Sequence, residues 1–423
     1  MDIPAHGWLA PFALTFLVSG LSLFWGFCAA VGYSLLQRTH LGLALGIGIA
    51  EVLRGFLLTG FPWGLIGYVW SNTPIAQFSA YVGIYGVTLL TVFASALAVL
   101  PRTNRNCAIS VIAFLGFIGL AWGGGLYRIA QSEFEYSTDT VRLAQPNAPQ
   151  ELKWDPDHNR MFFERLLKQT QAEPKPDLVI WPETALPLPF EFAEDLLAQL
   201  LDIAQGTPVL FGALRIEEGR YFNSIIYLNS EGEAAPVYDK HHLVPFGEYL
   251  PFEKFFGQMG LSALVEAAGT GFATGEGPLV FEIAKLGRVL PLICYEAVFP
   301  QDISSAGPRA DVMVQLTNDA WFGNFFGPQQ HLVKAQMRSI EQGVSLLRVA
   351  NTGITGMIDP LGRLNQFLPL NETGYIDVSV AKPLPPTPYS QNPLWIVLVM
   401  GLILSFFCII YDLSARRVDA AKE

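Results

Sequence analysis

The stretch RVLPLICYEAVFP, residues 288–300, decides the fold of the larger part of this chain. Strand-forming apolar residues end at Cys294, and a helical pattern follows at once. A nucleophile at such a turn is typically exposed and faces backbone N–H groups. Because a helix N-terminus and a nearby lysine lower a thiol pKa, we expect Cys294 to be a reactive thiolate. The alternative for a lone cysteine is a small buried hydrophobic residue.

Two earlier strand-like runs also end in charged residues. DLVIWPETALP (177–187) carries Glu183 within an apolar collar, which would raise the carboxyl pKa and suit a general base. VYDKHHLVPFGEYLP (237–251) carries Lys240, a cation suited to stabilising an oxyanion, and Glu248, which can hold it. The alternatives are a solvated loop carboxylate and a surface ion pair.

Strand-like and helical runs alternate around these positions, which is typical of an α/β layered domain. We place this domain at residues 138–385. Strands are predicted at 141–144, 178–181, 209–212, 225–228, 289–293, 312–316 and 346–350, and helices at 157–171, 191–204 and 328–342.

The remainder of the chain has a membrane-like composition. Of the 423 residues, 51% are hydrophobic and 15% are charged, and the mean hydropathy is +0.34. Soluble domains carry about a quarter charged residues. We therefore predict a transmembrane helical domain at 1–127, a C-terminal transmembrane helix at 393–411 and a tail at 412–423. The four spans expected in the first part are 8–36, 41–60, 75–100 and 107–126.

The positions of Lys and Arg in the short loops predict the orientation. Residues 1–7 and 60–74 contain no Lys or Arg, whereas Arg38, Arg102, Arg105 and the tail after the last span supply cations to the other side. The tail is therefore expected in the cytoplasm and the 138–385 domain outside it, which is the periplasm of a Gram-negative cell. The net charge of −11 argues against nucleic acid as a partner.

Several other side chains have two interpretations. Glu51 and Arg54 lie inside the second expected span, where a structural ion pair is favoured over a contact with a lipid head group. The Phe-rich segment 249–272 is either a core-packing loop or an arm that enters the bilayer. We expect Trp321, Phe322, Phe325 and Phe326 to form a pocket wall. The histidines are not arranged as a metal site and are expected to be hydrogen-bonded or solvated: His158, His241, His242 and His331.

Glu, Lys and Cys at three strand ends, in that chain order, resemble the catalytic set of the carbon–nitrogen hydrolase (nitrilase) superfamily. Longer motifs resemble the apolipoprotein N-acyltransferase family within it. These motifs are LTGFPWGLIGY (58–68), ELKWDP (151–156), WPET (181–184), DKHHLVPFGEYLP (239–251), CYE (294–296), NDAWFG (318–323) and LLRVANTGITG (346–356).

The resemblance implies integral membrane helices plus an α-β-β-α sandwich, in a bacterial inner membrane. It implies transfer of an acyl chain from the sn-1 position of a phospholipid to the α-amine of the N-terminal diacylglyceryl-cysteine of apolipoproteins. The implied chemistry is a ping-pong reaction through a Cys294 thioester, with no cofactor and no metal. Glu183 is implied as general base, Lys240 as oxyanion stabiliser and Cys294 as nucleophile. The implied supporting residues are Trp154, Glu248, Tyr295 and Glu296.

Two rival functions and one departure from the family remain open. A membrane-tethered nitrilase-like amidase would use the same three residues on a small amide, without needing the Phe-rich segment. A non-catalytic lipoprotein-binding scaffold would have no reason to carry all three. The family usually has about seven spans before its catalytic domain, so four spans imply a late start site or a truncated relative.

Overall fold

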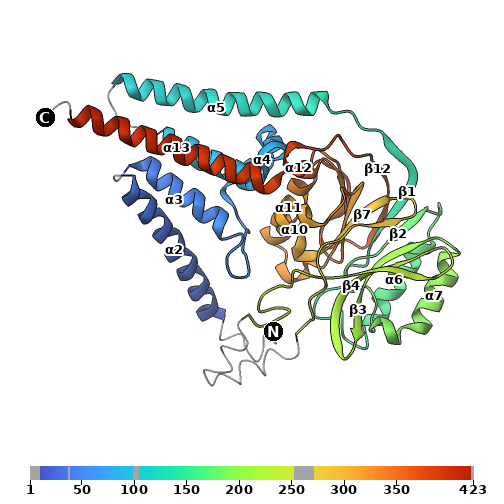
Figure 1. The fold of residues 1–423 in the computed structure, drawn as a ribbon. Helices are drawn as coiled ribbons and strands as arrows, with labels where there is room; N and C mark the ends of the chain where they lie inside the picture. Colours follow the sequence, from blue (N-terminus) through green and yellow to red (C-terminus); the bar gives the residue numbers. More distant parts are fainter. Residues whose placement is uncertain (1–9, 37–38, 99–103, 252–270, 421–423) are drawn as a thin grey trace. The chain divides into compact units, whose positions relative to one another are not determined.

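The computed structural model describes residues 10–36, 39–98, 104–251 and 271–420. The chain divides into two compact units, and each is described here by itself (Figure 1). One unit is Ser132–Thr387, and the other combines Met1–Gln131 with Pro388–Glu423.

The Ser132–Thr387 unit contains two six-stranded sheets, in the orders β12-β1-β2-β3-β4-β5 and β11-β10-β9-β8-β7-β6. In the first, β1, β2 and β3 are parallel neighbours, as are β7, β8 and β9 in the second. The first sheet consists of β1 (Tyr136–Gln145), β2 (Leu178–Ile180), β3 (Val209–Glu217), β4 (Arg220–Leu228), β5 (Ala234–Asp239) and β12 (Gly374–Ala381). The second consists of β6 (Phe281–Ile283), β7 (Gly287–Ile293), β8 (Val312–Thr317), β9 (Ser345–Ala350), β10 (Thr355–Ile358) and β11 (Leu364–Leu368).

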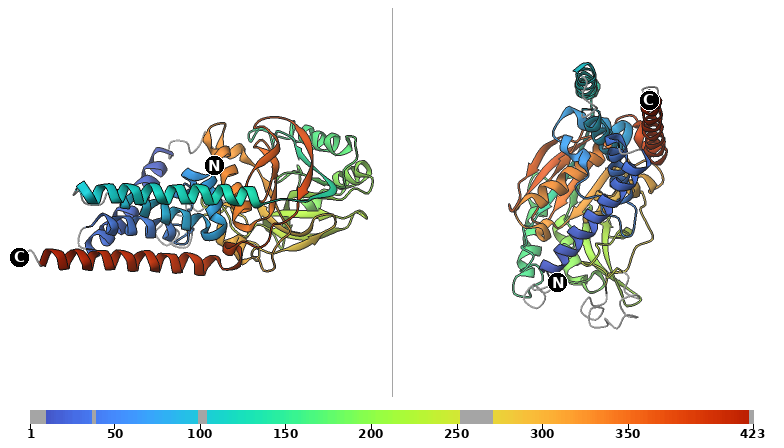
Figure 2. Two further views of the ribbon diagram at one scale, coloured as in Figure 1. Left: turned by 90° about the horizontal axis from the view of Figure 1, so that it is seen from above. Right: turned by 90° about the vertical axis from the view of Figure 1, so that its left-hand side faces the viewer.

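Because successive side chains of a strand point to opposite faces of its sheet, the two sheets contribute to three apolar layers. In β2, Leu178 and Ile180 join the core between the sheets, while Val179 faces the outer layer. The helices α6 (Asn159–Gln171) and α7 (Glu194–Ala204) cover the outer face of the first sheet. The helices α10 (Pro300–Ser305) and α11 (Phe326–Gln342) cover that of the second, as the views in Figure 2 allow the reader to follow. The predicted α-β-β-α sandwich is therefore confirmed.

The other unit is helical. Its longer helices are α2 (Ala10–Leu35), α3 (His40–Leu53), α4 (Ser79–Leu97), α5 (Asn104–Gln131) and α13 (Pro393–Ala420), with the short η2 (Ile66–Trp70), η3 (Pro74–Phe78) and α12 (Pro388–Gln391) between them. Within the described residues, four stretches are long and apolar enough to cross a membrane: Pro11–Leu35, Pro74–Leu97, Val111–Gln131 and Pro393–Ile410. Over the second expected span, α3 has 14 residues and ends at Leu53.

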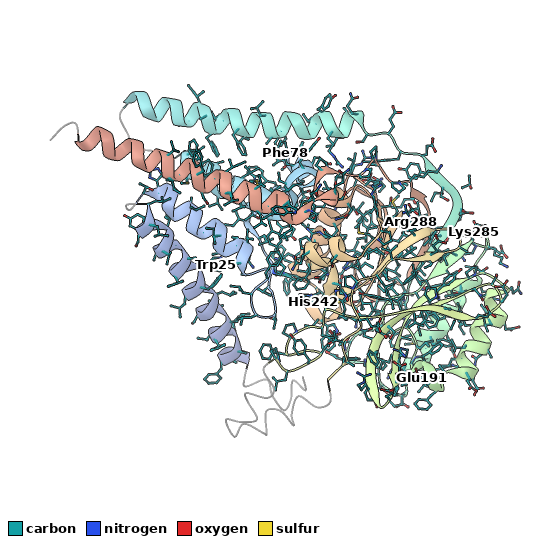
Figure 3. All side chains as sticks on the ribbon, in the orientation of Figure 1. Trp25, Phe78, Glu191, His242, Lys285 and Arg288 are labelled. Atoms are coloured by element: carbon teal, nitrogen blue, oxygen red, sulfur yellow. The ribbon has the colours of Figure 1, made fainter. Side chains whose placement is uncertain are left out.

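A buried ion pair lies at the end of α3, where Glu51 is inside the helix and Arg54 directly follows it. The Glu51 carboxylate lies 3.1 Å from Arg54 Nη2, and both residues are almost fully buried. Trp25 of α2, labelled in Figure 3, donates its indole N–H to Glu51 over 2.9 Å, and Ile66 N donates to the same carboxylate. Arg54 Nη1 also donates to the carbonyl of Trp63. The pair therefore joins two helices to the loop before η2, which supports the structural interpretation.

Candidate active site

Glu183, Lys240 and Cys294 stand where β2, β5 and β7 end. Lys240 and Cys294 directly follow the last residues of their strands, and Glu183 follows β2 after Trp181 and Pro182. The three side chains lie close together, since Lys240 shifts the pKa values of Glu183 and Cys294, and the charge of Glu183 shifts those of Lys240 and Cys294. The fold thus gathers into one buried site three residues that are far apart in the sequence.

Lys240 is held by carboxylates. Its Nζ donates to Glu248 Oε1 over 2.8 Å, and Val244 N donates to Glu248 Oε2 over 2.7 Å. Only 1% of Lys240 is exposed. Burial by itself lowers the pKa of Lys240, but the negative charges of Glu248 and Glu183 outweigh it and raise the pKa above its usual value. Lys240 is therefore a permanent cation inside the site.

The carboxyl group of Glu183 is buried and only partly hydrogen-bonded. Its Oε1 accepts from Asn223 Nδ2 over 2.7 Å, and its Oε2 has no hydrogen-bond partner within the described residues. Burial raises the pKa of Glu183, Lys240 opposes this, and the charge of Glu248 adds to it. The predicted upward shift is confirmed, which leaves Glu183 with the affinity for a proton that a general base needs.

Cys294 occupies a strained turn. Its φ of 50° lies in the left-handed region, which costs a residue with a Cβ about 1–2 kcal/mol. Its carbonyl oxygen accepts from Gln315 Nε2 over 2.9 Å, which helps to fix this conformation. Cys294 is also the first residue of η5 (Cys294–Val298), a short 3₁₀ helix.

The thiol of Cys294 differs from the sequence expectation. The residue is 7% exposed, so the predicted exposure is wrong. Burial, together with the negative charge of Glu183, raises the pKa of the Cys294 thiol to about 12, although Lys240 pulls it down. The predicted thiolate is therefore also wrong for this structure, because the desolvation of the sulfur outweighs the lysine. The thiol needs a base when it reacts.

Glu296 connects the end of β7 to the end of β5 through hydrogen bonds. Its Oε2 accepts from Ile293 N over 2.7 Å, at the end of β7. Its Oε1 accepts from Tyr238 Oη, His241 N and His242 N over 2.8, 2.9 and 3.2 Å, in the segment that ends β5. Burial raises the pKa of Glu296, but hydrogen bonding to His241 and that histidine's charge bring it below its usual value. This carboxylate therefore sets the spacing between the two strand ends.

A buried polar network behind Cys294 was not identified from the sequence. His331 Nδ1 lies 2.9 Å from Asp319 Oδ1, and Arg348 Nη2 donates to Asp319 Oδ2 over 2.5 Å. Arg348 Nη1 donates to Gln315 Oε1, and His331 Nε2 lies 3.0 Å from the Cys294 carbonyl oxygen. Asp319 and Arg348 belong to the two motifs NDAWFG and LLRVANTGITG, which was the available signal.

Trp154 and Tyr295, for which the sequence resemblance implied supporting roles, lie near Glu183 and Cys294. Lys153 and Trp154 line, with Glu183, a small cavity of about 20 Å³. Trp154 is 42% exposed, and Lys153 Nζ donates to the backbone oxygen of Glu183 over 2.9 Å. Tyr295 is buried, which raises the pKa of its hydroxyl, and its ring packs edge-on against Phe299 at 5.0 Å.

The remaining sequence expectations have mixed outcomes. Trp321, Phe325 and Phe326 are 65%, 83% and 77% exposed, so these three do not form the predicted pocket wall. Phe322 is half-buried, and its ring lies 5.5 Å from that of His331. Most of the Phe-rich segment, 252–270, lies outside the described residues, as do Arg38 and Arg102. Hydrogen bonding is confirmed for His241, His242 and His331. His241 and His242 both lie beside Asp302, which the sequence did not connect to them.

Comparisons with known proteins cover nearly the whole chain. Residues 140–384 match the family model for carbon-nitrogen hydrolase, and residues 3–97 match that for the apolipoprotein N-acyltransferase N-terminal domain. A curated apolipoprotein N-acyltransferase from Brucella melitensis is 37% identical over 95% of this chain and 79% of its own length. The one from Rhodopseudomonas palustris is 36% identical over 96% of this chain and 81% of its own length.

Solved structures also match part of this chain. A carbon–nitrogen hydrolase superfamily protein from Xanthomonas campestris has a TM-score of 0.41 at 20% identity, over 58% of this chain and 91% of its own. A Nesterenkonia amidase of the nitrilase superfamily has a TM-score of 0.43 at 20% identity, over 60% of this chain and 94% of its own.

Proposed function

The chain belongs to the apolipoprotein N-acyltransferase family of carbon–nitrogen hydrolases, and from this premise we propose that it N-acylates apolipoproteins. The acyl donor is the sn-1 ester of a phospholipid, and the acceptor is the α-amine of an N-terminal diacylglyceryl-cysteine. The similarity to the curated family extends over 95% of the chain, including the helical unit, and this observation carries the proposal. An amidase of small substrates would need only the catalytic unit.

In the first half-reaction, Cys294 attacks the ester carbonyl carbon while Glu183 takes the thiol proton. The resulting oxyanion is stabilised by Lys240 Nζ and by the backbone N–H of Tyr295. When the carbon–oxygen bond breaks, Glu183 returns the proton to the leaving alkoxide, and the lysophospholipid departs. The acyl chain stays on Cys294 as a thioester. The raised pKa values of both the thiol and Glu183 support direct proton transfer between them.

In the second half-reaction, the acceptor amine attacks the thioester carbonyl carbon. Glu183 removes the amine proton, the carbon–sulfur bond breaks, and the proton passes from Glu183 to the sulfur. The product is an amide, and the free thiol is restored. Glu248 keeps Lys240 in place, and Glu296 holds the turn that carries Cys294. Trp154 and Tyr295 border the substrate.

The protein is proposed to be a multi-pass protein of a bacterial inner membrane, with Ser132–Thr387 on the periplasmic side. Four long apolar helices and the family membership support the membrane location. The distribution of Lys and Arg in the sequence supports the orientation.

The test is to trap the thioester. The full chain in detergent is incubated with phospholipid labelled in the sn-1 chain, without acceptor, and label on the denatured protein that hydroxylamine releases is measured. We expect label on the parent and on Cys28→Ala, a control at another free cysteine, but none on Cys294→Ala. A diacylated lipopeptide should discharge it as an amide. Turnover of a small amide, with no label transferred to the lipopeptide, would favour the amidase instead.

A further inference from the structure

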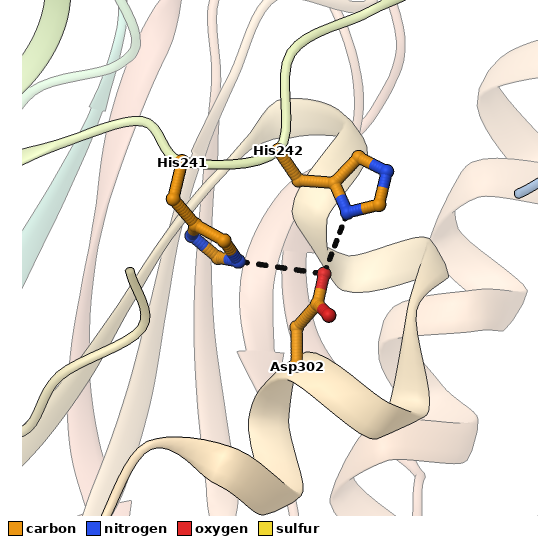
Figure 4. Close-up of side chains that lie close together, drawn as sticks. All are labelled: His241, His242 and Asp302. Atoms are coloured by element: carbon orange, nitrogen blue, oxygen red, sulfur yellow. Dashed lines mark hydrogen bonds and ion pairs between the residues drawn. The ribbon is translucent and has the colours of Figure 1, made fainter. Parts of the chain in front are cut away.

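His241, His242 and Asp302 converge at one place on the Ser132–Thr387 unit. The two histidines follow β5, and Asp302 lies in α10. His242 Nδ1 is 2.8 Å and His241 Nε2 is 3.4 Å from Asp302 Oδ2, so both imidazoles point at one carboxylate oxygen (Figure 4). The three side chains are 11%, 22% and 18% exposed, which leaves them within reach of solvent.

The spacing of these donor atoms approaches that of a metal site. In a tetrahedral zinc site with bonds of about 2.0–2.1 Å, neighbouring ligand atoms are about 3.3–3.4 Å apart. The 3.4 Å separation matches this value, the 2.8 Å separation needs a small opening, and all three atoms lie within 4.8 Å of one another. Two imidazoles and one carboxylate are ligands that zinc and similar transition-metal dications accept.

The surroundings of His241 orient it as a ligand. Its Nδ1 lies 2.7 Å from Oε1 of the fully buried Glu296 and 2.7 Å from Tyr238 Oη. The Nε2 atom faces Asp302 Oδ2 at 3.4 Å. A carboxylate behind a histidine ligand is the usual second layer of a metal site. The ring of His242 is fixed separately by stacking on Phe299 at 3.5 Å.

We propose that His241, His242 and Asp302 bind one divalent transition-metal ion of the Zn²⁺ class, with water at the open position. The ion would join the segment that follows β5, where Lys240 lies, to α10. Because Lys240 Nζ is bound by Glu248, which is outside the cluster, the ion braces the site and takes no part in the proposed acyl transfer. The proposal is independent of the substrate.

The test measures Zn²⁺ binding by the full chain in detergent, in competition with a chromophoric chelator. The chain carries Cys294→Ala so that the thiol cannot bind the metal. We expect one equivalent to bind. His242→Ala and Asp302→Asn should each weaken the affinity at least about tenfold. The control His158→Ala should leave it unchanged, because that histidine is 44% exposed and lies beside Asp155 instead.

A spectroscopic measurement needs no change in the cluster. Co²⁺ added to the Cys294→Ala chain should give the visible absorption of a four-coordinate nitrogen- and oxygen-ligated site, and Zn²⁺ should displace it. Absence of this absorption together with absence of saturable Zn²⁺ binding would overturn the proposal. So would equal affinities in Asp302→Asn and His158→Ala.

Discussion

Glutamine in place of Glu183 separates proton abstraction from electrostatic tuning of the thiol. With a pKa of about 12, the Cys294 thiol is ionised in about 3 of 100,000 molecules at pH 7.5, which corresponds to about 6 kcal/mol. A base that takes the proton during attack avoids most of this cost, and such a base typically contributes about 10²–10⁴ in rate. Glu183→Gln keeps an oxygen for Asn223 but cannot accept the proton. We expect thioester formation to slow by about 10²–10⁴.

The same substitution should have the opposite effect on the thiol alone. The negative charge of Glu183 raises the pKa of Cys294, so its removal lowers that pKa and increases the thiolate fraction. Alkylation by iodoacetamide, followed by mass spectrometry from pH 7 to 11, should therefore be faster in Glu183→Gln than in the parent. Glu164→Gln, at an exposed carboxylate on α6, is the control for both assays. If alkylation slows together with acylation, or if acylation is unchanged, the reasoning is refuted.

Three further outcomes are expected. Glu296→Gln should lower the free energy of unfolding by about 3–5 kcal/mol in urea denaturation, because it removes a buried charge that accepts four hydrogen bonds; a loss below about 1 kcal/mol would contradict this. Burial lowers the pKa of Lys153 from 10.5 to about 8, so the unfolded chain binds the extra proton between these values and the stability of the parent should rise with pH across this window. The free energy of unfolding, measured by denaturation at pH 8 and pH 10.5, should rise by up to about 3 kcal/mol in the parent and should not rise in Lys153→Met. An equal change in the two proteins would count against this. Glu51→Gln should lower the apparent Tm in detergent more than the double variant Glu51→Gln with Arg54→Met, because the single variant leaves Arg54 as an unpaired buried charge. Additive losses of Tm would exclude a mutually neutralising pair.

The sequence predicted the three parallel strands of the second sheet, but not the equally buried β10. The runs at 289–293, 312–316 and 346–350 are almost purely apolar, and they correspond to the parallel strands β7, β8 and β9. The edge strand β11 was missed because its side chains are mostly exposed and lack an apolar pattern. The positions of the strand ends followed from the predicted strands, and with them the positions of Glu183 and Cys294.

The pKa shifts of the site residues could not be predicted from the sequence in the same way. The sequence shows that a lysine is available to Cys294, but not how deeply the sulfur is buried or that Glu183 lies close to it. Those two facts reverse the sign of the thiol pKa shift. Asp302 was missed for a related reason, since its contact with His242 joins residues that only the packing of α10 brings together.

A protonated thiol beside a base of raised pKa gives the proposed reaction an order of events. While Glu183 is ionised, its charge raises the pKa of Cys294, so the sulfur is a poor leaving group and the thioester is less readily broken. Once Glu183 has taken a proton from the attacking amine, that charge is gone and the sulfur leaves more easily. Lys240 remains a cation throughout, because Glu248 still balances it. Cleavage of the acyl–sulfur bond is thereby favoured after the acceptor has given up its proton, and the burial that raises both pKa values also limits the water that could take the acceptor's place.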